Sequence, residues 1–338
     1  MSSFTSITAF EAALTDLPEA DQSAAAAATA RQRELTKPPG SLGRLEDIAI
    51  FMAGWQARPC PVLKRGRTAV FAANHGFVVH GVSAFPASVT AAMVNNFAAG
   101  GAAINALAGM SELELKVVAL DLDRPTLDFT SAAAMDADEC LEALAAGAEV
   151  VTADLNILTV GEMGIGNTTA AAALCARSLG GTASAWVGPG TGIDASGIAR
   201  KTKVVDQALA FHGSAPKTPF ETLRRLGGRE IAAVAGAVLR ARQLRVPVVL
   251  DGFITCAAIA PLAAAVPKFT DHCIAGHVSA EPGHHLLLQH LGLTPLLSLG
   301  MRLGEGSGGA LAVSIIRSAL AVHAQMATFA EAGVAGSL

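Results

Sequence analysis

The sequence contains no tyrosine, and aromatic residues make up only 4% of its 338 positions. Charged residues are also scarce at 15%, whereas 51% of the residues are hydrophobic. A chain this apolar can bury a large core and lies outside the composition of disordered proteins. With so few aromatic residues, that core must consist mainly of alanine, valine, leucine and isoleucine.

A basic excess is also missing, because the formal net charge is -4. An extended nucleic-acid surface needs a surplus of lysine and arginine, so we expect no nucleic-acid partner, although a local basic pocket for one phosphate is compatible with this charge. The five cysteines form no C-x-x-C pair, and their odd number suits a reducing compartment. The N-terminal 20 residues lack the basic start and apolar run of a signal peptide. We therefore expect a cytoplasmic protein.

A membrane span is not expected either. The most membrane-like stretch, VPVVLDGFITCAAIAPLAAAV at 246–266, is long enough to cross a bilayer. Asp251 and Gly252 interrupt it after a start rich in β-branched residues. This pattern predicts a buried strand, a turn and a buried helix.

The usual spacings of a metal site are absent too. Histidines are frequent near the C-terminal third, at positions 272, 277, 284, 285 and 290, but there is no H-E-x-x-H motif and no carboxylate at ligand spacing. We expect these histidines to line a crevice or the surface, and we expect neither a metal nor a cofactor.

Short runs rich in valine, isoleucine and leucine recur along the chain, each followed by a longer alanine-rich segment of helical character. They lie at 67–76, 115–124, 155–164, 246–253 and 272–283. Continuous apolarity indicates strands that are buried on both faces. The alternation predicts an α/β fold with a Rossmann-like, mostly parallel sheet and helices on both faces.

The two ends of the chain lack such strands. We expect residues 1–60 and 301–338 to form a small helical domain beside a large α/β domain at 61–300. In a parallel sheet, ligands bind beyond the carboxyl ends of the strands. The polar residues expected in that crevice are Asn74, His75, Asp121, Glu162, Asp251 and the segment 277–281.

Residues 161–168, GEMGIGNT, match the phosphate-loop pattern G-x-x-x-x-G-K-[ST] except that Asn167 replaces the lysine. The loop follows a predicted strand and precedes a helix expected to begin near Thr168. Glycines and a helix N-terminus can hold an anion, whereas the alternative is a tight turn with an ordinary helix cap. Without the lysine, triphosphate chemistry is disfavoured and a monophosphate remains compatible.

Two further glycine loops follow. GPGTGID at 188–194 comes after a short apolar stretch that we interpret as another strand, and Lys201 and Lys203 lie shortly beyond it. LGEGSGG at 303–309 places Glu305 between two glycines ahead of a long apolar helix. Its carboxylate is either approachable by a ligand or merely an acid favoured at a helix start.

Taken together, the motifs resemble the nicotinate-nucleotide:dimethylbenzimidazole phosphoribosyltransferase family over nearly the whole chain. They are KPPGSLGRLE (37–46), GEMGIGNTT (161–169), GPGTGID (188–194), LDGFITCAAIAPL (250–262), GHVSAEPGH (276–284) and LGEGSGGALA (303–312). The resemblance implies transfer of a phosphoribosyl group from nicotinate mononucleotide to 5,6-dimethylbenzimidazole. The products are α-ribazole 5'-phosphate and nicotinate, for the nucleotide loop of cobalamin. It also implies a homodimer, a Rossmann-like sheet with a small helical domain from both chain ends, and no required metal.

The resemblance also assigns site residues. Glu305 corresponds to the general base, and Glu162 is a second catalytic acid. The nucleotide-binding group is Gly164, Ile165, Gly166, Asn167, Thr168, Gly190, Thr191, Gly192 and Lys201. The pocket for the aromatic base is assigned to Ser83, Thr90, Met93 and Leu303.

The chemistry agrees with a single base. The pyridinium ring of nicotinate mononucleotide leaves as a neutral pyridine and needs no general acid, while the attacking benzimidazole must lose one proton. Two alternatives stay open at this point. One is a family member that uses another aromatic base, such as adenine or a phenol, and the other is a nucleotide-binding relative without catalysis.

Overall fold

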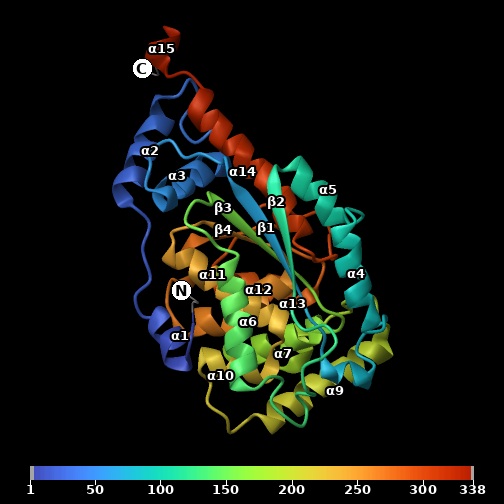
Figure 1. The fold of residues 1–338 in the computed structure, drawn as a ribbon. Coiled ribbons are helices and arrows are strands. Elements are labelled where there is room, and N and C mark those ends of the chain that lie inside the picture. The colour runs from blue at the N-terminus through green and yellow to red at the C-terminus, as the bar shows by residue number, and fades with distance from the viewer. Residues whose placement is uncertain (1–3, 336–338) are drawn as a thin grey trace.

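The computed structural model describes residues 4–335 and contains a five-stranded parallel sheet of order β2-β1-β3-β4-β5 (Figure 1). The strands are β1 (Gly66–Ala72), β2 (Leu113–Ala119), β3 (Ile157–Met163), β4 (Val248–Leu250) and β5 (Cys273–Ala275). Each overlaps one of the five runs in which a strand was predicted, although β1 and β2 begin one and two residues earlier, and the predicted parallel α/β fold is confirmed.

The two edge strands differ in burial. All residues of β1, β4 and β5 are buried, as continuous apolarity predicts. β2, at the other edge, is only partly buried, and Glu114 and Lys116 place charges on this open edge. Charged side chains on an edge strand discourage pairing with another chain.

Side chains of the strands alternate between two hydrophobic cores. One core lies between the sheet and helices α6 (Ala137–Glu149), α7 (Asn167–Leu179), α10 (Pro219–Leu226), α11 (Arg229–Gln243), α12 (Phe253–Ala265) and α13 (Pro282–Leu291). The other lies between the sheet and α3 (Arg44–Gln56), α4 (Ser88–Ala98), α5 (Ala103–Met110) and α14 (Ser307–Gln325). Helices therefore cover both faces.

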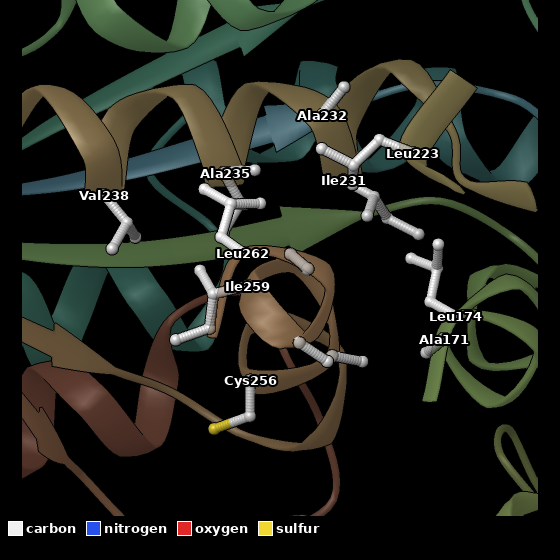
Figure 2. Packing of buried hydrophobic residues seen from close by; sticks show 14 of the residues in the cluster. Ala171, Leu174, Leu223, Ile231, Ala232, Ala235, Val238, Cys256, Ile259 and Leu262 are labelled. Carbon is white, nitrogen blue, oxygen red and sulfur yellow. The ribbon is translucent and has the colours of Figure 1, made fainter. Parts of the chain in front are cut away.

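The larger core is built from small and branched aliphatic side chains. Figure 2 shows Ala235 and Val238 of α11 facing Ile259 and Leu262 of α12, with Leu174 of α7 beside them. Glycine allows α6 and α11 to approach closely, because a Cβ on Gly147 would lie 1.8 Å from the carbonyl oxygen of Ala233.

Residues 22–56 and the C-terminal segment 307–332 meet at one end of the molecule, whereas the N-terminus lies away from it (Figure 1). There α2 (Gln22–Glu34) packs on α3, α3 packs on α14, and Leu35 forms an antiparallel bridge with Thr328 just before α15 (Phe329–Ala332). Arg31 Nε donates to the carbonyl of His323 at 2.8 Å. The first helix, α1 (Ile7–Ala13), instead packs on α10. The division into residues 61–300 and a helical domain of 1–60 with 301–338 remains our proposal.

One described helix, α14, is long and apolar enough to cross a membrane by length and composition. It packs on α3, α5 and the strands β3 and β4. Its Arg317 donates to the backbone carbonyl of Ser111 at 2.8 Å. These contacts identify α14 as a core helix. The membrane-like stretch 246–266 forms β4 and α12, the strand and helix that its sequence predicts.

Four described elements remain. They are α8 (Ala183–Trp186), α9 (Ala195–Phe211) and two 3-10 turns, η1 (Gly76–His80) and η2 (Phe269–His272). The strand predicted before the second glycine loop is wrong, because α8 occupies that stretch. Trp186 anchors this short helix by donating from its indole Nε1 to the carbonyl of Gly180 at 2.8 Å.

Candidate active site

A cleft of about 390 Å³ lies beyond the carboxyl ends of β3, β4 and β5, where the parallel topology predicts it. All three glycine loops contribute to it. The remaining walls come from 82–93, the start of α12 and the segment 277–281. The cleft is thus enclosed by segments that are far apart in the sequence.

The first glycine loop joins β3 to α7. The helix begins at Asn167, one residue earlier than predicted, and Gly166 precedes it with a φ of 90° that favours glycine. The backbone N–H of Asn167 donates to Gly164 at 3.0 Å, and that of Thr169 donates to Gly166 at 2.8 Å. Asn167 does not cap the helix with its side chain, because its amide Nδ2 donates to the carboxylate of Glu162.

Glu162 is a buried acid near the end of β3. Burial raises its pKa to about 8, and the nearby carboxylates of Asp251, Glu230 and Glu305 act in the same direction, against the hydrogen bond from Asn167. Glu162 therefore carries a proton in a large fraction of molecules at neutral pH, and it can donate a hydrogen bond to a ligand.

Glu305 lies on the third glycine loop, directly before α14. Its φ of 65° is unusual for a residue with a side chain. The backbone N–H of Glu305 donates to the carbonyl of Glu162 at 3.2 Å, which ties the loop to the end of β3. Glycine is needed at position 304, because a Cβ there would lie 2.6 Å from Glu162 Oε1.

Glu305 lines the cleft and is 4% exposed. Its buried Oε2 atom has no hydrogen-bond partner among the described residues. Burial, with a contribution from the charge of Asp251, raises its pKa to about 7. A carboxylate with this pKa and a free oxygen is well suited to accept a proton at neutral pH.

Asp251 follows β4 and holds the start of α14. Its Oδ1 accepts a hydrogen bond from Gly309 at 2.8 Å, and its Oδ2 accepts one from Gly306 at 3.2 Å. His277 Nε2 lies 3.6 Å from Oδ1. Burial raises the pKa of Asp251, whereas His277 and the backbone donors lower it. Asp251 therefore both fixes the backbone next to Glu305 and places a negative charge near that carboxylate.

Lys201 contacts the first two glycine loops but is not among the residues that line the cleft. It lies on α9 and is 1% exposed, with its Nζ donating to Thr168 Oγ1 at 2.9 Å and to the carbonyl of Gly188 at 3.0 Å. Burial lowers its pKa to about 8, although the charge of Glu281 opposes this. Lys201 thus joins the first two glycine loops from behind, because the packing of α9 turns its side chain inward.

The other predicted nucleotide-binding residues divide between lining and supporting positions. Gly164, Ile165, Gly166, Asn167, Thr168, Gly190 and Thr191 line the cleft. Gly192 is exposed and lies outside the lining. Gly190 is held in place by Glu281, whose Oε1 accepts the backbone N–H of Gly190 at 2.8 Å.

Apolar side chains make up much of the remaining lining, which we call the apolar wall. It contains Ser83, Met93 and Leu303, which were assigned to the base pocket, together with Val82, Phe85, Val89, Phe253 and Ile254. Thr90 is buried behind this wall, and its Oγ1 accepts the backbone N–H of Ile165 at 3.3 Å, so it supports the loop and does not contact the cleft. Phe85 and Leu303 are 50% and 56% exposed, which places them at the mouth.

Three residues expected in the crevice lie elsewhere. His75 is buried and pairs with Glu230 at 2.7 Å, Asn74 donates to the carbonyl of Leu122 at 2.9 Å, and Asp121 pairs with Arg124 at the surface. They follow β1 and β2, whereas the cleft opens over the other half of the sheet.

One charged lining residue was missed, Arg302, which lies directly before the quoted motif LGEGSGGALA. Glu281 lines the cleft and belongs to the segment 277–281 that was expected there. The histidines of the C-terminal third differ in their positions. His277 lines the cleft, whereas His272 and His284 are buried, and burial lowers the pKa of each to about 3. Within residues 4–335 no group of three or more His, Cys, Asp or Glu residues is placed to hold a metal ion.

Comparison with known proteins agrees with this arrangement. A family model described as "Phosphoribosyltransferase" matches residues 17–334. A nicotinate-nucleotide–dimethylbenzimidazole phosphoribosyltransferase of Novosphingobium aromaticivorans is 75% identical over 338 residues, covering 100% of both chains. A relative of the same name from Cereibacter sphaeroides is 55% identical over 333 residues, covering 98% of each chain.

Solved structures agree at the level of the whole fold. The crystal structure of CobT from Thermus thermophilus matches with a TM-score of 0.88 and 41% identity, over 93% of this chain and 100% of that chain. A second structure from Thermus thermophilus, named as the same phosphoribosyltransferase, matches with a TM-score of 0.87 and 40% identity, over 94% of this chain and 100% of that chain. The chain therefore belongs to the nicotinate-nucleotide–dimethylbenzimidazole phosphoribosyltransferase family.

Proposed function

We propose that the cleft transfers the phosphoribosyl group of nicotinate mononucleotide to 5,6-dimethylbenzimidazole. The products are α-ribazole 5'-phosphate and nicotinate, and the reaction serves assembly of the cobalamin nucleotide loop. The observation that supports this most directly is the unpartnered Oε2 of Glu305, in a cleft that the first glycine loop and several apolar side chains also line. The names of the relatives describe the same donor and acceptor.

The reaction needs one proton acceptor. A ring nitrogen of the benzimidazole uses its lone pair to bond the anomeric carbon, and the bond from that carbon to the pyridinium nitrogen breaks. The bonding electrons return to the pyridine ring, so nicotinate leaves without being protonated. The proton on the other benzimidazole nitrogen passes to Glu305. Attack opposite to the leaving group converts the β linkage into the α linkage.

Glu162 and the glycine loops hold the sugar phosphate. Glu162 is assigned to the ribose hydroxyls, because its pKa of about 8 leaves a proton that can be donated to a hydroxyl oxygen. The loops at 164–168 and 190–192 are assigned to the 5'-phosphate, with Lys201 joining them from behind. Fixing the phosphate aligns the anomeric carbon for attack from the wall formed by Ser83, Met93 and Leu303.

Product analysis tests the function directly. Purified protein is incubated with nicotinate mononucleotide and, separately, each member of a panel of benzimidazoles, purines and phenols. We expect α-ribazole 5'-phosphate as the favoured product, with release of one nicotinate per product formed. Preferential reaction with adenine or a phenol would move the protein to another acceptor, and tight nucleotide binding without any product would identify a non-catalytic relative.

The pH profile follows from Glu305. Its raised pKa means that the ionised, proton-accepting form predominates only above about pH 7. We expect kcat/KM to fall as the pH drops through 7, approaching about tenfold per pH unit well below it. Rates measured between pH 5 and 9 check this, with thermal unfolding at each pH to exclude loss of fold. A profile that stays flat down to pH 5 would contradict the assignment of Glu305.

A homodimer in the cytoplasm completes the proposal. Several large apolar side chains are exposed on the single chain, among them Val79 at 82%, Met110 at 80% and Leu127 at 60%. Where such side chains form one patch, they can be buried in a protein contact, and the resemblance to the family implies a homodimer. We expect light scattering at micromolar concentration to give twice the mass of the chain, whereas the mass of a monomer would contradict the dimer.

A further inference from the structure

Arg302 is the only lysine or arginine among the described residues that line the cleft. Its Nη1 donates to the carbonyl of Gly190 at 3.3 Å, and no carboxylate of the described chain lies within ion-pair distance of it. The side chain is otherwise exposed. A guanidinium has five N–H donors, so most of them are available to a ligand.

Lys201 cannot take the same role in this arrangement. Its ammonium is buried and already donates to Thr168 and to Gly188, and it lies outside the lining. Only one of its three N–H groups is left without a protein partner, and the residue is 1% exposed. Lys201 therefore connects the two loops by hydrogen bonds, and Arg302 is the cation that lines the cleft.

The helix N-terminus alone supplies few free donors. Three N–H groups at the start of α7 are committed, because Ile165 donates to Thr90 and the N–H groups of Asn167 and Thr169 donate to carbonyls of the loop. Binding a doubly charged phosphate monoester there requires additional positive charge. Three charged side chains contact the second glycine loop, Lys201, Glu281 and Arg302, and with all three ionised they leave one net positive charge there.

We infer that Arg302 binds the 5'-phosphate of the donor substrate, at the side of the second glycine loop. The inference rests on the proposed function for the identity of the donor. Nicotinate mononucleotide carries two anionic groups, the phosphate and the ring carboxylate. The hydrogen bond to Gly190 places the guanidinium beside the loop assigned to the phosphate, and Arg302 precedes Glu305 by three residues. Phosphate binding therefore also fixes the backbone that leads to the proton acceptor.

Arg302→Ala and Arg302→Lys test the inference, with Arg200→Ala as the control. Arg200 is an exposed arginine of α9 outside the cleft lining. Binding is measured by calorimetry with nicotinate mononucleotide, with nicotinate riboside, which lacks the phosphate, and with nicotinamide mononucleotide, which lacks the carboxylate. KM and kcat are measured for nicotinate mononucleotide.

Arg302→Ala is expected to weaken binding of both mononucleotides about 10- to 100-fold, the range for a hydrogen bond to a charged group. KM should rise in parallel with little change in kcat. Riboside affinity should stay at the wild-type value, Arg302→Lys should recover part of the loss, and Arg200→Ala should change nothing. Because calorimetry needs no turnover, this pattern can hold even if the proposed acceptor is wrong.

Two results would overturn the inference. An equal loss for the riboside with no loss for nicotinamide mononucleotide would assign Arg302 to the ring carboxylate. Unchanged affinity for all three ligands, with an unchanged thermal midpoint, would leave Arg302 without a ligand-binding role.

Discussion

Replacing Glu305 by glutamine is expected to lower kcat by about 10²–10⁴-fold, the usual range for a positioned base. Affinity for nicotinate mononucleotide should change far less. Glutamine keeps the shape of the side chain and its capacity for hydrogen bonding but removes the basic oxygen. The structure leaves Oε2 of Glu305 without a partner among the described residues, so no structural hydrogen bond of that atom is lost.

The substitution is expected to lower kcat more than affinity because the proton moves only as the new bond forms. Benzimidazole becomes acidic only as its nitrogen bonds the anomeric carbon, so the attraction to Glu305 develops mainly in the transition state. Burial strengthens this attraction, since the developing cation and the carboxylate meet where water is largely excluded. Removing the interaction therefore raises the barrier more than it weakens the ground-state complex.

Steady-state kinetics and calorimetry of Glu305→Gln check this split. Glu142→Gln is a suitable control, because Glu142 is an exposed glutamate of α6. Near-normal kcat in Glu305→Gln would exclude Glu305 as the essential base and make Glu162 the next candidate. A large rise in KM with unchanged kcat would show that Glu305 binds substrate without accepting the proton.

Much of the fold could be predicted because buried parallel strands leave a strong trace in the sequence. Continuous apolar runs located all five strands. The order of strand, glycine loop and helix placed the first loop at the carboxyl ends of the strands. The segment before the second loop misled the same reasoning. A run as short as Ala183–Trp186 can be buried either as a helix or as a strand. Its hydrophobic pattern therefore does not distinguish the two kinds of element.

The site was predictable as a set of loops but not in the roles of its individual side chains. The sequence places Lys201 shortly after a glycine loop, yet the packing of α9 directs its ammonium behind that loop. Likewise, the pKa of Glu162 depends on carboxylates that β3, β4 and α11 bring together only in the folded chain. Such effects arise from tertiary proximity, which local pattern does not contain.

The role of Asp251 arises from such tertiary contacts. Asp251→Asn is expected to lower kcat/KM about a hundredfold, because a displacement of about 1 Å at a reacting group can have an effect of this size. Both carboxylate oxygens of Asp251 accept backbone N–H groups at the start of α14, from Gly306 and Gly309. An asparagine presents an NH₂ group to one of these donors. The backbone beside Glu305 must then shift. Glu305 has a φ of 65°, a strained backbone conformation that persists only while the surrounding structure holds it.

The same substitution should also move the pH profile. Burial raises the pKa of Glu305, and the negative charge of Asp251 raises it further. Without that charge the pKa of Glu305 falls, so the ionised base persists to lower pH. The acid limb of kcat/KM is therefore expected to shift below its wild-type position near pH 7, even though the maximal rate is lower.

Two measurements on Asp251→Asn separate this electrostatic role from a merely structural one. Kinetics across pH locate the acid limb, and thermal unfolding reports how much stability the lost hydrogen bond removes. Asp138→Asn, at an exposed position of α6, controls for loss of a surface charge. A lower rate with an unmoved acid limb would mean that Asp251 only holds the loop. A wild-type rate and limb together would remove Asp251 from the mechanism, because the position of Glu305 would then not depend on it.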